Sequence, residues 1–350
     1  MKKRLLFYAL VCVFSSLTAH AQQPVEGSTY YLPKTVIRVA LLVQKDTYHP
    51  GELAEYAERY LQEIVNQEEN TFYSIANIQL NSYGVPDPAK QFTAKMDNKH
   101  SINKLYKDDN GVLIGVNSQG RKQAALETFT PAPKAKALNP RDYMSQEILS
   151  AGSKEKMAEL CAREIYDIRE SRNQLTRGEA DFMPKDGEQL KTMLQQLETQ
   201  EKALRQLFEG TTTSDTTEHI ITYIPEKEVN KEVLFRFSNK LGMVDADDLS
   251  GNPYYITIKA LQTVQTSNID IENNKKVKDD VGINTNRPGK IRVSLHAGQK
   301  RCGEVEMYAA QFGEVEPLSG ELFGKKVTTH VILNPVTGNA ETIQTELLKK

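Results

Sequence analysis

The chain has 350 residues, of which 39% are hydrophobic, and its formal charge is −2. This near balance leaves no strongly basic face with which to displace counterions from nucleic acid, so we expect no nucleic-acid partner. The length and the apolar content predict two domains of ordinary size. Three cysteines are too few for a scaffold stapled by disulfides, so an ordinary hydrophobic core must hold the fold.

Residues 1–21 have the pattern of a secretory signal peptide. A basic start (MKKR) precedes an apolar stretch over residues 5–17, and Ala19-His20-Ala21 forms a small-x-small cleavage pattern. A membrane-spanning helix needs about 20 apolar residues, which favours a cleaved leader over an anchor. Cys12 lacks the small preceding residue that lipidation requires. No later apolar run reaches spanning length, so we expect an exported mature chain without a transmembrane segment.

Residues 22–128 are predicted to form an N-terminal mixed α/β domain. The run "TVIRVALLVQ" is β-branched and apolar enough for a buried strand, and "HPGELAEYAERYLQEI" has helical spacing with Pro50 at a first helical position. Three strand-like runs follow, which are "FYSIANIQLNSYG", "QFTAKMD" and "GVLIGVN". Turn-rich segments separate them, and the Asp-Asn-Gly before the last run is a strong hairpin signal.

Residues 129–141 form a Pro/Ala linker, which proline should keep extended and outside any sheet. Residues 142–210 then carry two apolar stripes at helical spacing and predict a long antiparallel helical hairpin. Asp186 and Gln189 have the spacing of a capping box at the start of the second helix. A hairpin of this length either contacts a partner or braces two domains, and we expect partner contact. The Ser/Thr tract 211–218 is interpreted as a hinge.

Residues 219–350 are predicted to form a C-terminal antiparallel β-sandwich-like domain, because at least six strand-like runs with turns every 8–15 residues occur there. Within "GKIRVSLHAG", apolar and polar residues alternate, as in a half-buried strand. The predicted fold class is therefore α+β. Cys161, on the hairpin's apolar stripe, is expected to behave as a small hydrophobe, although a disulfide with Cys302 remains an alternative.

The sequence designates no catalytic, cofactor-binding or metal-binding residue and no cofactor. Histidines after residue 21 lie far apart, so no single element offers two imidazoles to a metal ion. The acidic segment "VDADDLSGN" departs from a calcium loop at the fifth position and places its glycine one residue late, so we interpret it as an acidic turn. Neither a nucleophile elbow nor a glycine-rich phosphate loop occurs.

Two other functions stay open at this point. The first is a glycan or small-ligand binding module, for which the Tyr30-Tyr31 and Tyr254-Tyr255 pairs could supply stacking surfaces. The absence of tryptophan weighs mildly against it. The second is a periplasmic hydrolase that uses carboxylates gathered from separate loops, which would require two facing carboxylates about 5–10 Å apart in a cleft.

Several long blocks resemble a family of exported Bacteroidota proteins catalogued as domain of unknown function 4831: "STYYLPKTVIRVALLVQKDTYHPGELAEYAERYL", "YGVPDPAKQF", "NKLGMVDADDLSGNPYYI" and "AQFGEVEPL", together with the stretch around the hairpin. The resemblance implies an envelope protein, periplasmic or associated with the outer membrane, and carries over no catalytic residue. We therefore expect a non-enzymatic cell-envelope protein that docks an envelope protein partner through its helical hairpin. The sequence does not determine the oligomeric state.

Overall fold

The computed structural model describes residues 27–96, 99–134, 136–261 and 280–347. Strands account for 49% and helices for 22% of the structure, and the strands form three antiparallel sheets. The protein is therefore mostly β, and the predicted α+β class was wrong. The physical reason is that strands from before residue 129 and strands from after residue 210 pair in the same sheets. Local sequence patterns do not reveal such long-range pairing.

One very long strand, β1 (Gly27–His49), is the centre of the first sheet. It pairs with β2 (Asn70–Lys95) on one side and with β5 (Thr211–Tyr223) on the other. At about 3.3 Å per residue, its 23 residues span roughly 75 Å. The apolar run predicted as a buried strand is the middle of β1, where the side chains on both faces of the strand are covered.

The second sheet packs against the middle of the first. It consists of β6 (Val229–Ser238), β7 (Gly242–Val244), β8 (Asn252–Ala260), β9 (Asp280–Ala297) and β10 (Lys300–Ser319), in the order β10-β9-β8-β6-β7. Alternate residues of β1, from Ile37 to Val43, point into the shared apolar layer. The sheet contributes Phe235, Phe237, Ile256, Ile258, Ile291, Val293 and Leu295 to the same layer.

A third, smaller sheet packs against the beginning of β1. It contains β3 (Leu105–Lys107), β4 (Leu113–Val116), β11 (Val327–Leu333) and β12 (Ala340–Leu347), in the order β12-β11-β4-β3. Tyr30 and Leu32 of β1 are fully buried there with Phe323 of the 3-10 turn η4 (Gly320–Phe323). The predicted Asp-Asn-Gly turn joins β3 to β4, with Gly111 at a φ of 84°. The second and third sheets and the strands packed on them form the body.

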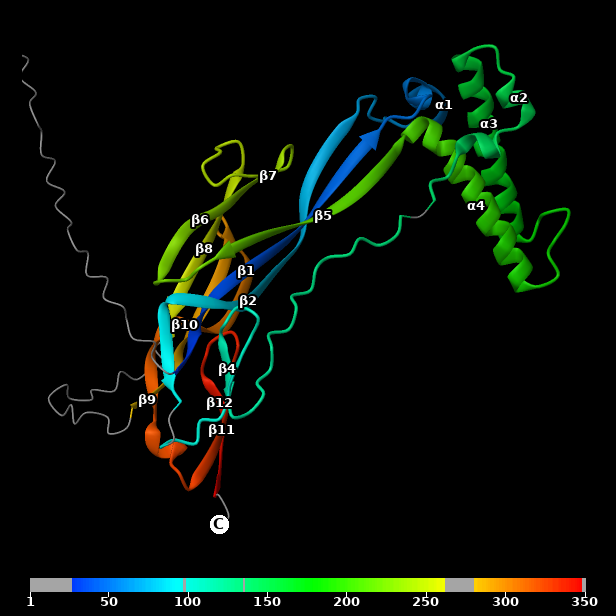
Figure 1. Ribbon diagram of the computed structural model, residues 1–350. Coiled ribbons are helices and arrows are strands. Elements are labelled where there is room, and N and C mark those ends of the chain that lie inside the picture. Colours follow the sequence, from blue (N-terminus) through cyan, green and yellow to red (C-terminus); the bar gives the residue numbers. More distant parts are fainter. Residues whose placement is uncertain (1–26, 97–98, 135, 262–279, 348–350) are drawn as a thin grey trace, which may run out of the picture.

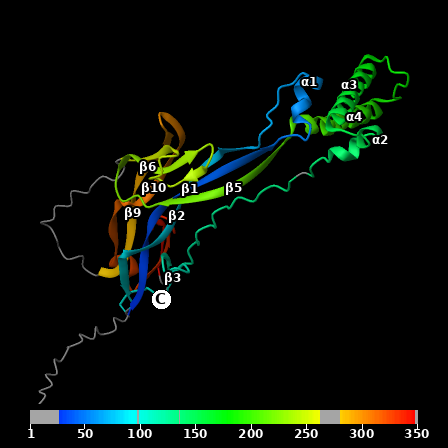
Figure 2. The ribbon, with the colours of Figure 1, turned by 90° about the horizontal axis from the view of Figure 1, so that it is seen from above.

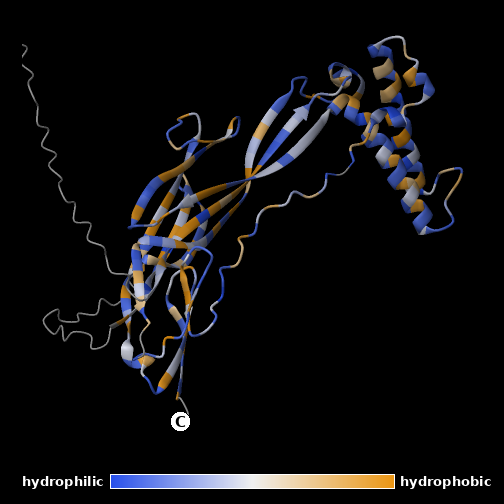
Figure 3. Ribbon diagram, in the orientation of Figure 1, coloured by the Kyte–Doolittle hydropathy of each residue, from blue (hydrophilic) through white to orange (hydrophobic). Residues whose placement is uncertain are grey.

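Beyond the body, the outer parts of β1, β2 and β5 continue as a three-stranded ribbon (Figures 1 and 2). Its polar strands include residues 44–49 of β1 and the tract from Thr211 to Thr217 of β5, which lie in register with one another. Figure 3 shows mainly hydrophilic and intermediate colours over this part of β1 and β5. The ribbon is stabilised by strand pairing rather than by an apolar layer on its faces.

The helices form a head at the outer end of the ribbon (Figure 1). Its elements are η1 (Ala54–Tyr56), α1 (Ala57–Leu61), η2 (Pro140–Tyr143), α2 (Gln146–Leu149), α3 (Lys154–Arg177) and α4 (Gly187–Glu209). The side chains of Ser153 and Asp186 cap α3 and α4, and Gly178 ends α3 in a left-handed conformation. Within the described residues, no helix combines the length and apolarity needed to cross a bilayer.

The head is tied to the ribbon at a crowded junction. The hydroxyl of Tyr48, near the end of β1, lies within hydrogen-bond distance of two carbonyl oxygens, 2.7 Å from that of Asn66 and 2.8 Å from that of Glu209, and can donate to either. Gly210 joins α4 to β5 at a φ of 76°, and a Cβ there would lie 2.2 Å from the carbonyl oxygen of His49. Only glycine satisfies both the backbone conformation and the close approach. The direction in which the head leaves the ribbon is therefore fixed by covalent and hydrogen-bonded contacts.

A strap without regular secondary structure, residues 119–134 and 136–139, runs from the body to the head beside the ribbon (Figures 1 and 2). It covers the face of the first sheet that points away from the second. Phe129 donates its backbone N–H to Glu218 at 3.2 Å, and Gln123 accepts from the N–H of Gly84 at 2.7 Å. Glu218 also pairs at 2.9 Å with Arg38, which is 3% exposed on β1. This buried ion pair anchors the strap to the sheet.

Four local expectations need correction. The 211–218 tract is part of β5 and pairs with β1, so it is not a hinge. Residues 219–350 are not an independent sandwich, because β1 and β4 complete their cores. The helix predicted from Pro50 is only η1 and α1, since Gln62 adopts a left-handed conformation that ends it. The turn-rich segment predicted between "FYSIANIQLNSYG" and "QFTAKMD" lies within continuous β2, as a bulge between Pro86 and Gln91 opposite the step from Tyr31 to Pro33.

The predicted long antiparallel helical hairpin over 142–210 was also wrong, because these helices do not form a unit of their own. The head is a composite of α3 and α4 with segments from both sides, and its core includes Leu53, Ala57 and Leu61 from the segment that follows β1. Those apolar residues are shielded from water by α3 and α4, and they in turn cover part of the apolar surface of these two helices. Segments far apart in the sequence therefore build the head together.

The shared apolar layer predicts a large effect of truncating one β1 side chain. Leu41 is fully buried between the first and second sheets, so Leu41→Ala should lower the free energy of unfolding by about 2–5 kcal/mol in urea titrations. Ile220, on the neighbouring β5, is 49% exposed, so Ile220→Ala should change it by less than about 1 kcal/mol. Equal effects of the two substitutions would contradict this packing.

Candidate interaction surface on the helical head

The half of the α3–α4 pair nearest the ribbon has an ordinary apolar core. Here the N-terminal part of α3 lies against the C-terminal part of α4, and η1, α1, η2 and α2 cover the pair. The fully enclosed side chains include Leu53, Ile148, Ile165, Leu204 and Phe208. The surrounding helices therefore shield these core side chains from solvent.

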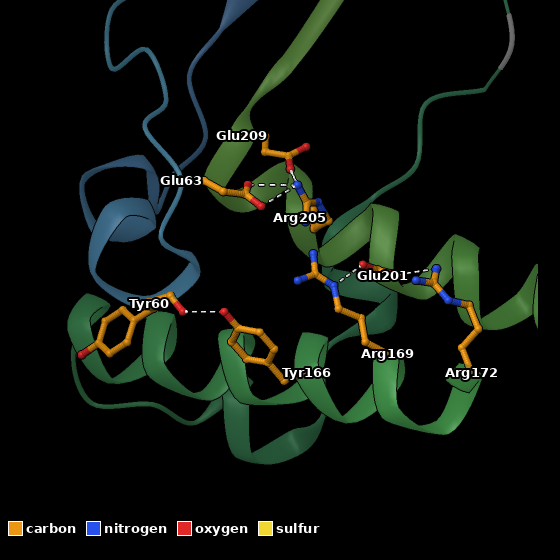
Figure 4. Close-up of polar contacts among 8 residues, drawn as sticks. All are labelled: Tyr60, Glu63, Tyr166, Arg169, Arg172, Glu201, Arg205 and Glu209. Atoms are coloured by element: carbon orange, nitrogen blue, oxygen red, sulfur yellow. Dashed lines mark hydrogen bonds and ion pairs between the residues drawn. The ribbon is translucent and has the colours of Figure 1, made fainter. Parts of the chain in front are cut away.

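Ion pairs join the helices in the middle of the head (Figure 4). Glu201 of α4 is only 8% exposed and accepts from Arg169 at 2.6 Å and from Arg172 at 2.9 Å, both on α3. Two guanidinium groups on one nearly buried carboxylate compensate its desolvation through charge-assisted hydrogen bonds. Glu201 therefore fixes the register of α3 against α4.

A second ion-pair group ties α4 to the segment after α1 (Figure 4). Arg205 donates to both carboxylate oxygens of Glu63 at 2.9 and 3.0 Å, and also pairs with Glu209 one turn along α4. On the other side of α1, the hydroxyl of Tyr166 donates to the carbonyl of Tyr60 at 3.3 Å. These contacts join α1 and the segment after it to α3 and α4 in the proximal head.

The distal half of the pair is less completely covered. Every buried residue of α4 lies at Glu201 or beyond, whereas Leu190, Met193, Leu194 and Leu197 stay partly exposed. Phe182, in the connection between the helices, is 63% exposed. The same apolar stripe that is buried near the ribbon therefore becomes accessible towards the tip.

Two shallow grooves of different character lie on this distal half. The first, of about 430 Å³, lies between the helices and below their connection, and is lined only by uncharged residues: Ser171, Gln174, Leu175, Ala180, Phe182, Thr192, Met193, Gln196, Leu197 and Gln200. We call it the tip groove. The second, of about 580 Å³, follows one face of α4 and includes Lys191 and Glu198. We call it the α4 face.

Cys161 belongs to the head core and is fully buried. Burial, followed by the charges of Glu164 and Glu52, raises the pKa of its thiol to about 12. Such a thiol is protonated at neutral pH and is not an activated nucleophile. Cys302, on β10 of the body, is partly exposed, and both cysteines are free. The disulfide that the sequence left open does not form, because the two residues belong to different parts of the molecule.

The acidic segment of the β7–β8 connection forms a turn. Asp248 accepts from the backbone N–H of Ser250 at 2.9 Å, and this hydrogen bond lowers the pKa of its carboxyl. Over the described residues, no three or more His, Cys, Asp or Glu side chains group so that they could hold a metal ion. His49, His219 and His330 each have separate local partners, namely Glu69, Thr217 and Asn117.

The tyrosine pairs are largely structural. Tyr30 is fully buried, and its hydroxyl donates to the carbonyl of Gly282 and accepts from the N–H of Asn284. Tyr254 stacks on Phe235 with ring centroids 4.6 Å apart. Tyr30 and Tyr254 therefore pack against aromatic side chains of neighbouring strands, whereas Tyr31 and Tyr255 are partly exposed.

Two carboxylates, Glu127 and Glu218, line one cleft beneath the strap. Glu218 has one oxygen on Arg38 and the other on the N–H of Phe129. A carboxylate held in this way anchors the strap and is poorly suited to proton transfer. The sequence around Glu218 does not reveal this structural role, because its partner Arg38 lies 180 residues away.

A family model matches residues 26–341, which include the body, the ribbon, the strap and the head. The chain belongs to this family, which is described as Domain of unknown function (DUF4831). No curated protein and no solved structure matches the chain. The match confirms the resemblance to domain of unknown function 4831.

Glu201 should be important for the stability of the head. Glu201→Gln removes the charge that compensates Arg169 and Arg172, and should lower the free energy of unfolding by about 1–3 kcal/mol. Amide hydrogen exchange in α3 and α4 should accelerate, whereas exchange in β8 and β9 should not. The exposed Glu198→Gln is the matched control, and an equal loss in both variants would contradict the bridging role.

The buried thiol of Cys161 predicts a pH dependence of stability. In the unfolded chain the thiol ionises near its ordinary pKa of 9.0, whereas in the folded chain it stays protonated until about pH 12. The unfolded state therefore loses its proton first, and this contribution to stability falls as the pH rises through this interval. Urea titrations at pH 8 and pH 10 should show a larger decrease for the wild type than for Cys161→Ala. Equal decreases in the two proteins would contradict a raised pKa of the Cys161 thiol in the folded state.

Proposed function

We propose that the protein is a non-enzymatic interaction component of the cell envelope that uses its helical head to bind another envelope protein. The observation that carries the proposal is the placement of a partly uncovered, uncharged groove at the outer end of a head that a polar ribbon separates from the body. A ribbon of this length costs many ordered residues and gives little apolar burial. What the ribbon provides is a head placed away from the body.

The tip groove best fits the apolar face of an amphipathic helix. Its floor is apolar, with Leu175, Met193 and Leu197, and its rim carries the amides of Gln174, Gln196 and Gln200. A helix bound between α3 and α4 would bury the exposed Phe182 and complete the bundle that η2 and α2 complete nearer the ribbon. The uncharged lining disfavours a strongly charged partner face, because its charges would be desolvated without compensation.

Export supports a partner in the envelope. The signal-peptide pattern in residues 1–21 predicts delivery across the inner membrane, and we place the mature protein in the periplasm or at the outer membrane of a Bacteroidota cell. These residues lie outside the part that the structure describes. A mature N-terminus at Gln22 in protein from the envelope fraction would support this placement, and an uncleaved cytoplasmic chain would contradict it.

A second candidate function, binding of a glycan or other polar small ligand, is favoured by a different groove. About 710 Å³ in volume, it lies between β2, the strap and the β11–β12 turn, and amide side chains of Gln79, Asn81, Gln123 and Asn334 line it. Amides suit hydroxyl-rich ligands because they donate and accept hydrogen bonds. Gln123 already accepts from the backbone N–H of Gly84, so part of this capacity is used to hold the strap.

The partner-binding proposal predicts that one exposed aromatic side chain controls capture. Phe182→Ser in the tagged mature protein should weaken retention of its envelope partner by roughly tenfold or more, as expected for an aromatic anchor. Leu249→Ser is the control, because Leu249 is an exposed apolar residue, 81% accessible, on a loop of the body. Capture from detergent-solubilised envelopes measures both. Retention that is unchanged in Phe182→Ser, or lost equally in Leu249→Ser, would contradict binding through the tip groove.

A further inference from the structure

The α4 face is a separate surface from the tip groove. Its lining residues are Gly187, Leu190, Lys191, Leu194, Gln195 and Glu198, which recur at intervals of one and two helical turns. None of them lines the tip groove. At about 100° per residue, the mean directions of the two sets lie on nearly opposite sides of α4. An occupant of one surface therefore leaves the other accessible.

Charge on the α4 face is self-complementary. Lys191 and Glu198 are both exposed, and neither makes a hydrogen bond or an ion pair with another of the described residues. They are seven residues apart, about 10.5 Å along the helix, with Leu194 nearly midway. When two such helices pack antiparallel around Leu194, each Lys191 lies opposite the other copy's Glu198. A parallel arrangement would place like charges opposite each other.

We propose that a second copy of this chain occupies the α4 face, as a two-fold symmetric, antiparallel α4–α4 contact centred on Leu194. An isologous contact of this kind uses the same surface twice, so two Lys191–Glu198 pairs flank one central leucine contact. The antiparallel arrangement also solves a steric problem. Each α4 leads into its own ribbon at its C-terminal end, so the two bodies leave the contact in opposite directions.

This inference does not depend on the proposed function, because it concerns the purified chain without any other protein. It predicts a reversible dimer of the full mature chain in sedimentation-equilibrium measurements at low salt. Lys191→Glu and Glu198→Lys should each weaken the dimer by on the order of tenfold or more, since each substitution creates two like-charge contacts. The double variant, with both substitutions, should restore it, because the pairs are re-formed with exchanged signs.

Lys154→Glu is the matched control, since it reverses an exposed charge at the opposite end of the head and should leave the dimer unchanged. A wild-type chain that stays monomeric at all concentrations would overturn the proposal. So would a dimer that tolerates both single reversals, or single reversals whose combination does not restore association. Circular dichroism of every variant checks that the helices stay folded. Envelope capture by the monomeric variants, unaffected by these changes, would show that the proposed function is separate.

Discussion

The pairing of β1 with strands on both sides holds the whole molecule together. Its first residues complete the smaller core with the third sheet, its middle completes the apolar layer with the second sheet, and its last residues enter the head through Tyr48. A 23-residue strand is much longer than the usual five or six residues. Because β1 contributes side chains to both cores of the body and its end is hydrogen-bonded to the head, this one strand joins the three parts of the molecule.

This arrangement gives the ribbon its unusual composition. Where β1 is buried on both faces it is apolar, and where it leaves the body both faces meet water and the sequence becomes Gln, Lys, Asp and Thr. Long polar strands with free edges risk slipping in register or pairing with other chains. The strap limits that freedom, because it is anchored to the sheet by Glu218 and to β5 by a 3.2 Å ion pair between Lys134 and Asp215. The head is thereby held at a defined distance and in a defined direction.

Several features could be predicted from sequence because they depend on neighbours along the chain. The cap at Asp186, the turn before β4 and the buried middle of β1 follow from local composition and spacing. The sheet order could not be predicted, because β5 pairs with β1 across more than 160 residues and its Thr-rich outer half has the composition of a flexible tract. Strand pairing supplied by β1 overrides that local preference.

The candidate surface likewise combines local features that the sequence predicts with long-range packing that it does not. The apolar stripe of α4 was visible as spacing, but the sequence could not show that η1, α1, η2 and α2 cover only its ribbon-proximal half. Likewise, the role of Glu201 depends on two arginines of α3 that face it only after the helices pair. The exposure of Phe182 and the self-complementary charges of the α4 face are consequences of what the head leaves uncovered.

The head is held away from the body at the end of a continuous β1. Small-angle X-ray scattering of the full mature chain, with the Lys191→Glu variant to keep it monomeric, measures this separation. A compact globule of this length would have a radius of gyration of about 20 Å. We expect a clearly larger value, and a maximum dimension above the roughly 75 Å that β1 alone spans. A radius near 20 Å, with a symmetric distance distribution, would contradict it.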